Sequence, residues 1–226
     1  MKGINIQFPL DGFEKLINKI GWESLDEWYK FWNEKKDLLL IEKFWDNNVH
    51  EDWIWGLALP LLSQAYKFKN DFSERKLIGL SALPGTGKTT LGKWLESISK
   101  KLNFKIAGIS IDDFYLPSSE MDLAIKNNPW NVSRGFPGPH SIDLLNKKLL
   151  EWKIDGTLNV PVFDKSLRDG LGDRSHWRDE SPDLLIIEGW FLGVNPLSDN
   201  FNNTEIIYPP LSSYESSFRD NNQNNL

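Results

Sequence analysis

The sequence contains no cysteine and only three histidines among its 226 residues. The absence of thiols excludes a disulfide framework and a thiolate metal site. The histidines, at positions 50, 140 and 176, are too far apart in sequence to form a close ligand pair, so we expect no zinc site. A chain without disulfides is compatible with a reducing compartment, and we expect this one in the cytoplasm.

The chain also lacks an excess of basic residues and a long apolar run. With 26 Lys and Arg against 32 Asp and Glu, its formal net charge is −6. This charge argues against a broad basic surface that binds nucleic acid. The most apolar segment, residues 53–62 (WIWGLALPLL), has about half the length needed to span a bilayer and contains Pro60. The N-terminus lacks the apolar core of a signal peptide. We therefore expect neither a nucleic-acid nor a membrane partner, and nothing in the sequence indicates an oligomeric state.

What the sequence does contain is a phosphate-binding loop. Residues 77–90 read LIGLSALPGTGKTT and follow the pattern G-x-x-x-x-G-K-[ST], except that Ala82 replaces the first glycine. A small residue suffices at that position if its φ is negative. Glycines let backbone N–H groups surround phosphate oxygens, and the N-terminus of the following helix adds partial positive charge. The predicted nucleotide-binding residues are Ala82, Leu83, Pro84, Gly85, Thr86, Gly87, Lys88, Thr89 and Thr90.

The segments on both sides of this loop support the assignment. An apolar run precedes it, and residues 89–102 after it carry apolar side chains at helical spacing. The alternative is a turn rich in Gly and Pro that happens to precede a helix. With these flanks we predict that Lys88 reaches the β- and γ-phosphates and that the Thr89 hydroxyl binds Mg²⁺. The predicted fold is α/β of the P-loop NTPase type, with helices on both faces of a parallel sheet.

A second apolar run, residues 104–111, ends in two aspartates, Asp112 and Asp113. The interval from Lys88 to Asp112 has the length of one helical crossover, so this run is predicted to lie parallel to the first. Both carboxylates would then emerge at the edge of the sheet that carries the phosphate loop. Asp112 is the candidate general base for an acceptor hydroxyl, with Asp113 as its substitute. The alternative role for such a pair is to cap a turn or a helix.

A third apolar run, residues 184–189, is continuous, as suits a strand that is covered on both faces. Glu188 lies at its end. We predict that Glu188 holds Mg²⁺ together with Thr89, either directly or through water. The alternative is a carboxylate with a structural partner at the end of the strand.

Two irregular loops, residues 133–141 and 164–174, lie between the second and third runs, and long glycine-bearing loops commonly carry function. Their cations are candidates to neutralise a substrate carboxylate or the γ-phosphate, and we assign catalytic roles to Arg134 and Lys165. The ordinary alternative for each is a surface salt bridge. The predicted substrate residues are Asp113, Tyr115, His140, Arg168 and Arg174. For His140, a hydrogen bond within its loop is an equal alternative.

The remaining segments complete the predicted organisation. Residues 1–75 form a helical extension rich in Trp, in which Ser24 and Glu27 have the spacing of a capping box and the aromatic residues belong to the core. Residues 76–197 form the P-loop domain, and residues 198–226 a polar tail that we expect to be disordered. Within the domain we expect a helix in 118–131 broken at Pro129, a helix over 142–152 capped by Ser141 or Asp143, and a short run over 158–163 that leads into the second irregular loop.

Five segments together carry a resemblance to a known family: SALPGTGKTT, SIDDFYLP, RGFPGPHSID, PVFDKSLRDGLGDR and LLIIEGWFLGVNP. Over about residues 76–197 the chain resembles the plant-type and cyanobacterial D-glycerate 3-kinases, P-loop kinases related to phosphoribulokinase, uridine kinase and pantothenate kinase. The combination of RGFPGPH, FDKS and GDR narrows the resemblance to glycerate kinase. It implies ATP- and Mg²⁺-dependent phosphorylation of the 3-hydroxyl of D-glycerate to 3-phosphoglycerate, in photorespiratory carbon recovery. The S-x-D-x-F-Y segment of the related kinases matches Asp112 as the base.

The sequence departs from that family at its C-terminal end. Members of the family continue for roughly another hundred residues, with a basic lid segment, so the resemblance implies that the C-terminal part is lacking. Cations of such a lid contribute strongly to the rate of phosphoryl transfer, so their loss would weaken activity. Two alternatives therefore stay open. One is a P-loop kinase for another small hydroxylated metabolite, similar to uridine or pantothenate, and the other is a truncated, non-catalytic nucleotide-binding module.

Overall fold

The computed structural model describes residues 7, 9–45, 49–69, 74–130, 132–136, 138–190, 192–194, 213 and 217. The chain divides into two compact units, and both are built from several stretches of sequence. Residues 1–78, 84–108 and 181–186 form the first unit, and residues 79–83, 109–180 and 187–226 form the second. The division of the sequence at residues 75 and 197 stays a prediction, and nearly all of the predicted tail lies outside the described residues.

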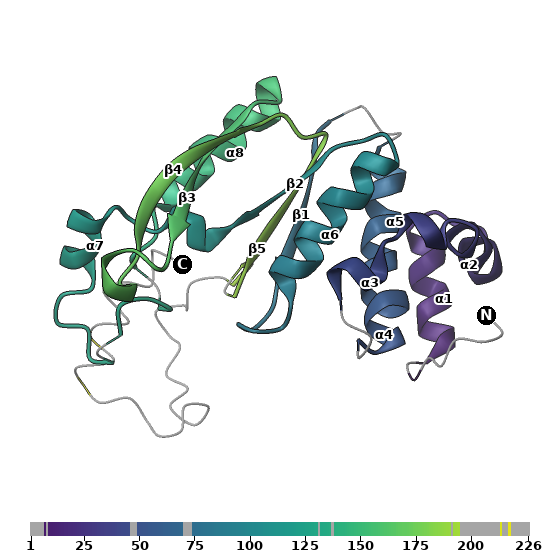
Figure 1. Ribbon diagram of the computed structural model, residues 1–226, viewed down its shortest axis with the longest axis horizontal. Coiled ribbons are helices and arrows are strands. Elements are labelled where there is room, and N and C mark those ends of the chain that lie inside the picture. Colours follow the sequence, from purple (N-terminus) through teal and green to yellow (C-terminus); the bar gives the residue numbers. More distant parts are fainter. Residues whose placement is uncertain are drawn as a thin grey trace. The chain divides into compact units, whose positions relative to one another are not determined.

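A parallel sheet of three strands carries the P-loop architecture (Figure 1). Its strands are β1 (Lys76–Ser81), β2 (Ile106–Ser110) and β5 (Leu184–Gly189), in the order β1-β5-β2. The first four residues of β5 are buried, as its uninterrupted apolar sequence predicts. Helix α6 (Lys88–Lys101) follows β1 and buries the side chains that the helical spacing selected, Leu91, Trp94, Leu95 and Ile98. The predicted α/β class with a parallel sheet is confirmed.

The N-terminal part of the first unit is helical, as predicted. Its elements are α1 (Leu10–Lys19), α2 (Leu25–Asn33), η1 (Lys36–Leu38), α3 (Ile41–Phe44), α4 (Glu51–Trp53), the π turn η2 (Ile54–Ala58) and α5 (Leu59–Phe68). Ser24 caps α2 by accepting the Glu27 N–H at 3.1 Å. Glu27 in turn accepts the backbone N–H of Glu23, one residue before the cap, so only half of the predicted capping box forms.

Trp28 and Trp32 lie in the core of this part, which confirms their structural interpretation. Both side chains are fully buried, and both indole N–H groups donate to the Ser63 hydroxyl, at 2.6 and 2.7 Å. Ser63 itself donates to the Leu59 carbonyl oxygen at 2.7 Å, so this buried hydroxyl is satisfied as donor and acceptor.

The same core continues onto α6. The Trp94 indole N–H donates to the Leu39 carbonyl oxygen at 2.6 Å, and its ring lies 5.3 Å from that of Trp45. At the other end of the helix, the Lys69 ammonium donates to the carbonyl oxygen of Leu102 at 2.8 Å. The helical extension is therefore packed directly on the helix that follows the phosphate loop.

The second unit combines a hairpin with short helices. It contains η3 (Ile111–Phe114), α7 (Ser118–Ala124), α8 (Ile142–Asp155), β3 (Leu158–Asp164), η4 (Arg168–Gly170) and β4 (Asp173–Glu180). Strands β3 and β4 pair antiparallel, with a register irregularity between Val162 and Phe163. Helix α8 packs against β3.

Three local predictions for this unit were wrong. Strand β4 was missed, and the predicted loop 164–174 ends earlier, because Asp173 and Arg174 already belong to that strand. The predicted helix in 118–131 stops at Ala124, before the left-handed residue Asn127 and well before Pro129. Of the two residues predicted to cap α8, Ser141 directly precedes the helix but its side chain makes no capping hydrogen bond, and Asp143 lies in the first turn. Among the described helices, none is long and apolar enough to cross a membrane.

Candidate functional site

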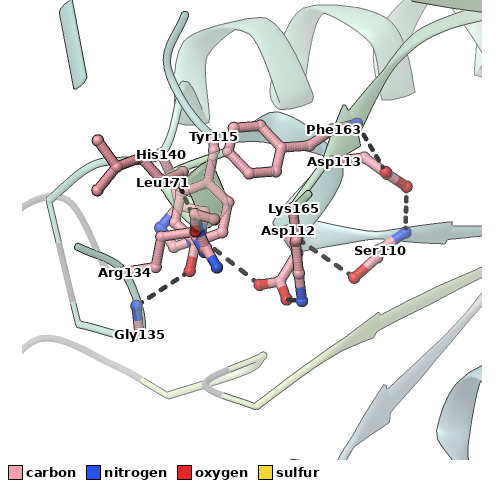
Figure 2. Close-up of polar contacts among 11 residues, drawn as sticks. Ser110, Asp112, Asp113, Tyr115, Arg134, Gly135, His140, Phe163, Lys165 and Leu171 are labelled. Carbon is pink, nitrogen blue, oxygen red and sulfur yellow. Dashed lines mark hydrogen bonds and ion pairs between the residues drawn. The ribbon is translucent and has the colours of Figure 1, made fainter. Parts of the chain in front are cut away.

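The end of β2 fixes the two aspartates in different roles. Ser110 and Asp113 form a reciprocal capping box around η3, in which the Ser110 hydroxyl accepts the Asp112 N–H at 3.2 Å. The Asp113 carboxylate accepts the backbone N–H of Ser110 at 3.3 Å and that of Phe163 at 3.2 Å. Burial raises the pKa of Asp113, against the lowering effect of these two backbone hydrogen bonds. Asp113 therefore joins β2 to β3, which leaves Asp112 as the better placed of the two for chemistry (Figure 2).

The Asp112 carboxylate faces a lysine and a histidine from the two irregular loops. The Lys165 ammonium donates to its Oδ2 at 2.6 Å, and the Nε2 atom of His140 lies 3.9 Å from its Oδ1 (Figure 2). Burial on its own would raise the pKa of Asp112, but His140 and Lys165 together lower it to about 2. The carboxylate is therefore ionised at any physiological pH.

Two polar atoms at this point are buried and unsatisfied. Within the described part of the chain, neither Oδ1 of Asp112 nor Nε2 of His140 has a hydrogen-bond partner. Leaving such atoms without a partner costs roughly 1–3 kcal/mol each, so native structures rarely do so without a reason. An acceptor and a ring nitrogen that face each other in this way suit a small hydroxyl group, which donates to one and accepts from the other.

Stacking and backbone pairing hold the His140 ring in place. The ring stacks on Tyr115 with 4.1 Å between centroids and 24° between planes. Residues 115 and 140 form an isolated antiparallel bridge, flanked by a hydrogen bond from Leu116 N–H to Pro139 O at 2.9 Å. The Tyr115 hydroxyl accepts the Gly135 N–H at 3.1 Å, and burial, followed by the nearby Asp112 carboxylate, raises the pKa of Tyr115 to about 12.

The three arginines predicted as anion ligands all have structural contacts. Nη1 of Arg134 donates to the carbonyl oxygens of Gly170, at 2.8 Å, and Leu171. Nη2 of Arg168 donates to both oxygens of Asp122, at 2.9 and 2.7 Å. Arg134 therefore binds the backbone of the loop between β3 and β4, and Arg168 joins that loop to α7.

Arg174 makes the third contact of this kind. Its Nε donates to the Tyr115 carbonyl oxygen at 2.9 Å, and its Nη2 donates to the Ser141 hydroxyl at 2.7 Å. The Ser141 hydroxyl thus accepts from Arg174 and makes no capping hydrogen bond to α8. Of the four predicted cations, Lys165 is the one whose described contacts include Asp112.

The phosphate loop has the conformation that its glycines predict. Gly85 and Gly87 take φ values of +77° and +85°, which L side chains adopt only with strain. Gly87 is the residue before α6, so Lys88 and Thr89 are the first two residues of a 14-residue helix. Ala82 is not among the residues with positive φ, in agreement with the prediction that a small side chain is tolerated there.

The residues predicted to hold Mg²⁺ fit that ion by their chemistry. Thr89 brings a hydroxyl at the start of α6, and Glu188 brings a partly buried carboxylate near the end of β5. Mg²⁺ prefers oxygen ligands and is commonly held by one or two protein groups together with substrate phosphates. Over the described ranges, no group of three or more His, Asp or Glu side chains is arranged to hold a metal ion.

Sequence reasoning missed several residues that build the site. Ser110 and Phe163 hold Asp113, Asp122 holds Arg168, and Ser141 holds Arg174. For Ser110 a signal existed, since Ser110 and Asp113 have the spacing of a capping box. The partners of the arginines come from distant parts of the chain and had no comparable local signal.

The sequence is similar to those of known kinases. No family model matches the chain. D-glycerate 3-kinase, chloroplastic, from Arabidopsis thaliana is 31% identical over 209 residues, which are 80% of this chain and 46% of the relative. Uncharacterized kinase mug58 from Schizosaccharomyces pombe is 36% identical over 132 residues, 54% of this chain and 48% of the relative. The chain thus spans about half the length of the curated relatives that it matches.

The fold of the chain is also similar to that of a solved kinase structure. D-glycerate 3-kinase from Cryptococcus neoformans var. grubii superposes with a TM-score of 0.59 and 27% sequence identity. The match covers 73% of this chain and 67% of that structure.

Proposed function

Since the chain is homologous to D-glycerate 3-kinase and to further kinases, we propose that it is an ATP-dependent kinase for a small molecule, and that its substrate is D-glycerate. The product would be 3-phosphoglycerate, as in photorespiratory carbon recovery, and the cofactors ATP and Mg²⁺. The observation that carries this proposal is the Asp112 carboxylate at the end of β2, held by Lys165 and facing the buried Nε2 atom of His140.

We assign Oδ1 of Asp112 and Nε2 of His140 as the hydrogen-bond partners of the acceptor hydroxyl. Oδ1 and Nε2 are 3.9 Å apart, so one hydroxyl oxygen can lie about 2.8 Å from both. The hydroxyl then donates to the carboxylate, which orients its oxygen lone pair for attack. Phosphoryl transfer depends mainly on positioning and charge stabilisation, so a carboxylate with a pKa of about 2 can serve as the orienting acceptor although it is a weak base.

In this proposal the phosphate loop binds the other reactant, ATP. The N–H groups of residues 85–90 and the Lys88 ammonium would bind the β- and γ-phosphates at the start of α6. Thr89 and Glu188 would hold Mg²⁺, which neutralises charge on the phosphates when it is bound.

Lys165 has the best position among the cations for the substrate. Its ammonium touches Asp112, and its side chain is 57% exposed, so it can reach a carboxylate or phosphate beside that residue. Roles for Arg134, Arg168 and Arg174 in anion binding stay predictions from the sequence, since the contacts described for them brace the loops. The cytoplasmic location also stays a prediction, and the plant relative is described as chloroplastic.

The test is ADP formation by the purified chain with ATP and Mg²⁺, with and without D-glycerate. We expect turnover that depends on D-glycerate. Asp112→Asn should reduce this turnover by at least about 100-fold and leave ATP binding intact. The matched control is Asp169→Asn, which removes an exposed carboxylate from the nearby loop at a left-handed position that Asn tolerates. Equal turnover with uridine or pantothenate would refute the choice of substrate. ATP binding without turnover on any hydroxylated metabolite would instead favour a nucleotide-binding module.

A further inference from the structure

One tryptophan of the helical extension lies against the phosphate loop. A Cβ atom built on Gly87 would be 3.6 Å from Cζ2 of Trp53, an ordinary van der Waals distance. Gly87 is the left-handed residue immediately before α6, where the loop turns into the helix. The edge of the indole therefore lies beside the loop at the residue that precedes Lys88.

The backbone around Trp53 differs from an ordinary helix. Trp53 is the last residue of α4, and the π turn η2 (Ile54–Ala58) begins directly after it. A π turn inserts an extra residue into the helical repeat, which changes the direction of the side chains on either side of it, and such turns are frequent at functional sites. Trp53, whose indole lies beside the phosphate loop, stands directly before this irregular turn.

The rest of the extension gives this contact a fixed support. Trp94 on α6 donates its indole N–H to Leu39, and its ring packs on Trp45. The helix that begins at Lys88 thus packs against the extension at Leu39 and Trp45. The extension that carries Trp53 is therefore packed on the same helix that begins directly after Gly87.

Such a contact matters because the loop is rich in glycine. Gly85 and Gly87 are free to take many backbone conformations, and only some of them direct N–H groups toward a phosphate. The apparent affinity for a ligand falls in proportion to the fraction of molecules in the binding conformation. An indole ring beside Gly87 restricts the conformations of the loop and so raises the fraction of molecules in the binding conformation.

We propose that Trp53 is a positioning residue of the nucleotide site, which holds the phosphate loop in its binding conformation through contact with Gly87. The ligand class is a nucleoside di- or triphosphate, so the inference rests on the proposed function. It assigns the helical extension a part in nucleotide binding, in addition to its part in the hydrophobic core.

The experiment compares Trp53→Ala and Trp53→Phe with the control Trp55→Phe. Trp55 lies two residues further on and packs on Trp28 and Tyr29, with ring centroids 5.9 and 5.2 Å apart. Binding of Mg²⁺ and ADP is measured by calorimetry. We expect the Kd for ADP to rise about tenfold in Trp53→Ala, less in Trp53→Phe, and by less than about twofold in the control. Thermal unfolding identifies any variant that fails to fold, and Trp53→Phe then carries the test.

Two further readouts separate positioning from a general loss of structure. In steady-state kinetics, Trp53→Ala should raise the KM for ATP while kcat and the KM for D-glycerate stay near wild type. In fluorescence, the change on ADP binding should shrink in Trp53→Phe and persist in Trp55→Phe. Unchanged ADP binding in folded Trp53 variants, or an equal loss in the control, overturns this inference and leaves the proposed function standing. Failure of the wild type to bind ADP overturns both.

Discussion

The ionised Asp112 carboxylate should make a measurable contribution to the stability of the protein. Its pKa is lowered from the ordinary value of 3.8 to about 2, since the attraction of His140 and Lys165 outweighs the effect of burial. Replacing Asp112 by Asn keeps the shape of the side chain and removes its charge. The difference in free energy of unfolding between wild type and Asp112→Asn should therefore depend on pH.

The magnitude follows from the shift. Each unit of pKa corresponds to about 1.4 kcal/mol, so the change from 3.8 to about 2 stabilises the ionised folded state by about 2 kcal/mol. The Lys165 side chain is 57% exposed, so solvent screening makes this an upper value, and about 1 kcal/mol is a realistic lower one. Because the folded-state pKa is depressed, the contribution is fully present above about pH 4 and is lost as the pH falls through about 2. About half of it should remain at pH 3.

The assay is urea unfolding of wild type and Asp112→Asn at several pH values from 7 to 3, followed by circular dichroism. Titrating groups remote from Asp112 are common to the two proteins and cancel in the difference, whereas His140 and Lys165 face Asp112 and belong to the measured effect. Asp169→Asn serves as the control for the loss of one negative charge. The wild type should lose about 0.5–1 kcal/mol of its advantage between pH 7 and pH 3. A difference that stays constant over this range would refute the assigned environment of Asp112.

Four other substitutions, one of them a control, test separate parts of the structure. Lys165→Met should lower kcat by about 100-fold in the ADP-formation assay, because it removes the cation beside Asp112, and an unchanged kcat would contradict that role. Gly172→Ala should cost about 2–4 kcal/mol in urea unfolding, since its Cβ would overlap a buried aromatic ring. Gly135→Ala, also at positive φ but with open space around it, should cost only about 1 kcal/mol. Ser63→Ala should cost about 2–4 kcal/mol by calorimetric unfolding, because two buried indole N–H groups lose their acceptor, and a cost below about 1 kcal/mol would argue against that network.

The sequence allowed the parallel sheet and the phosphate loop to be predicted because their signals are local. Strands β1, β2 and β5 are apolar runs, and the glycines at 85 and 87 stand where the chain needs positive φ. The start of α6 follows from the same segment, since Lys88 comes directly after the last glycine. In each case the residues that determine the structure lie within a few positions of it.

Strand β4 could not be predicted because its sequence, DRSHWRDE, has neither an apolar run nor a clear alternation. Its pairing with β3 and hydrogen bonds across the hairpin hold it instead. The Asn159 amide donates to the Asp179 carboxylate at 2.6 Å across the hairpin, and the Ser175 hydroxyl donates to the Val162 carbonyl oxygen at 3.1 Å. Pairing of this kind depends on the partner strand, which a local pattern does not report.

The prediction of the site was least complete for its cations, because the sequence did not indicate which of them hold the loop and which lies beside Asp112. The loop between β3 and β4 holds two consecutive residues with left-handed backbone conformation, Arg168 at φ +55° and Asp169 at φ +57°, which costs roughly 1–3 kcal/mol for each. Such a conformation persists only where contacts enforce it. Arg134 on the loop carbonyls and the ion pair of Arg168 with Asp122 provide those contacts. The same loop begins with Lys165 beside Asp112, so the arginines hold in place the segment whose lysine adjoins the carboxylate.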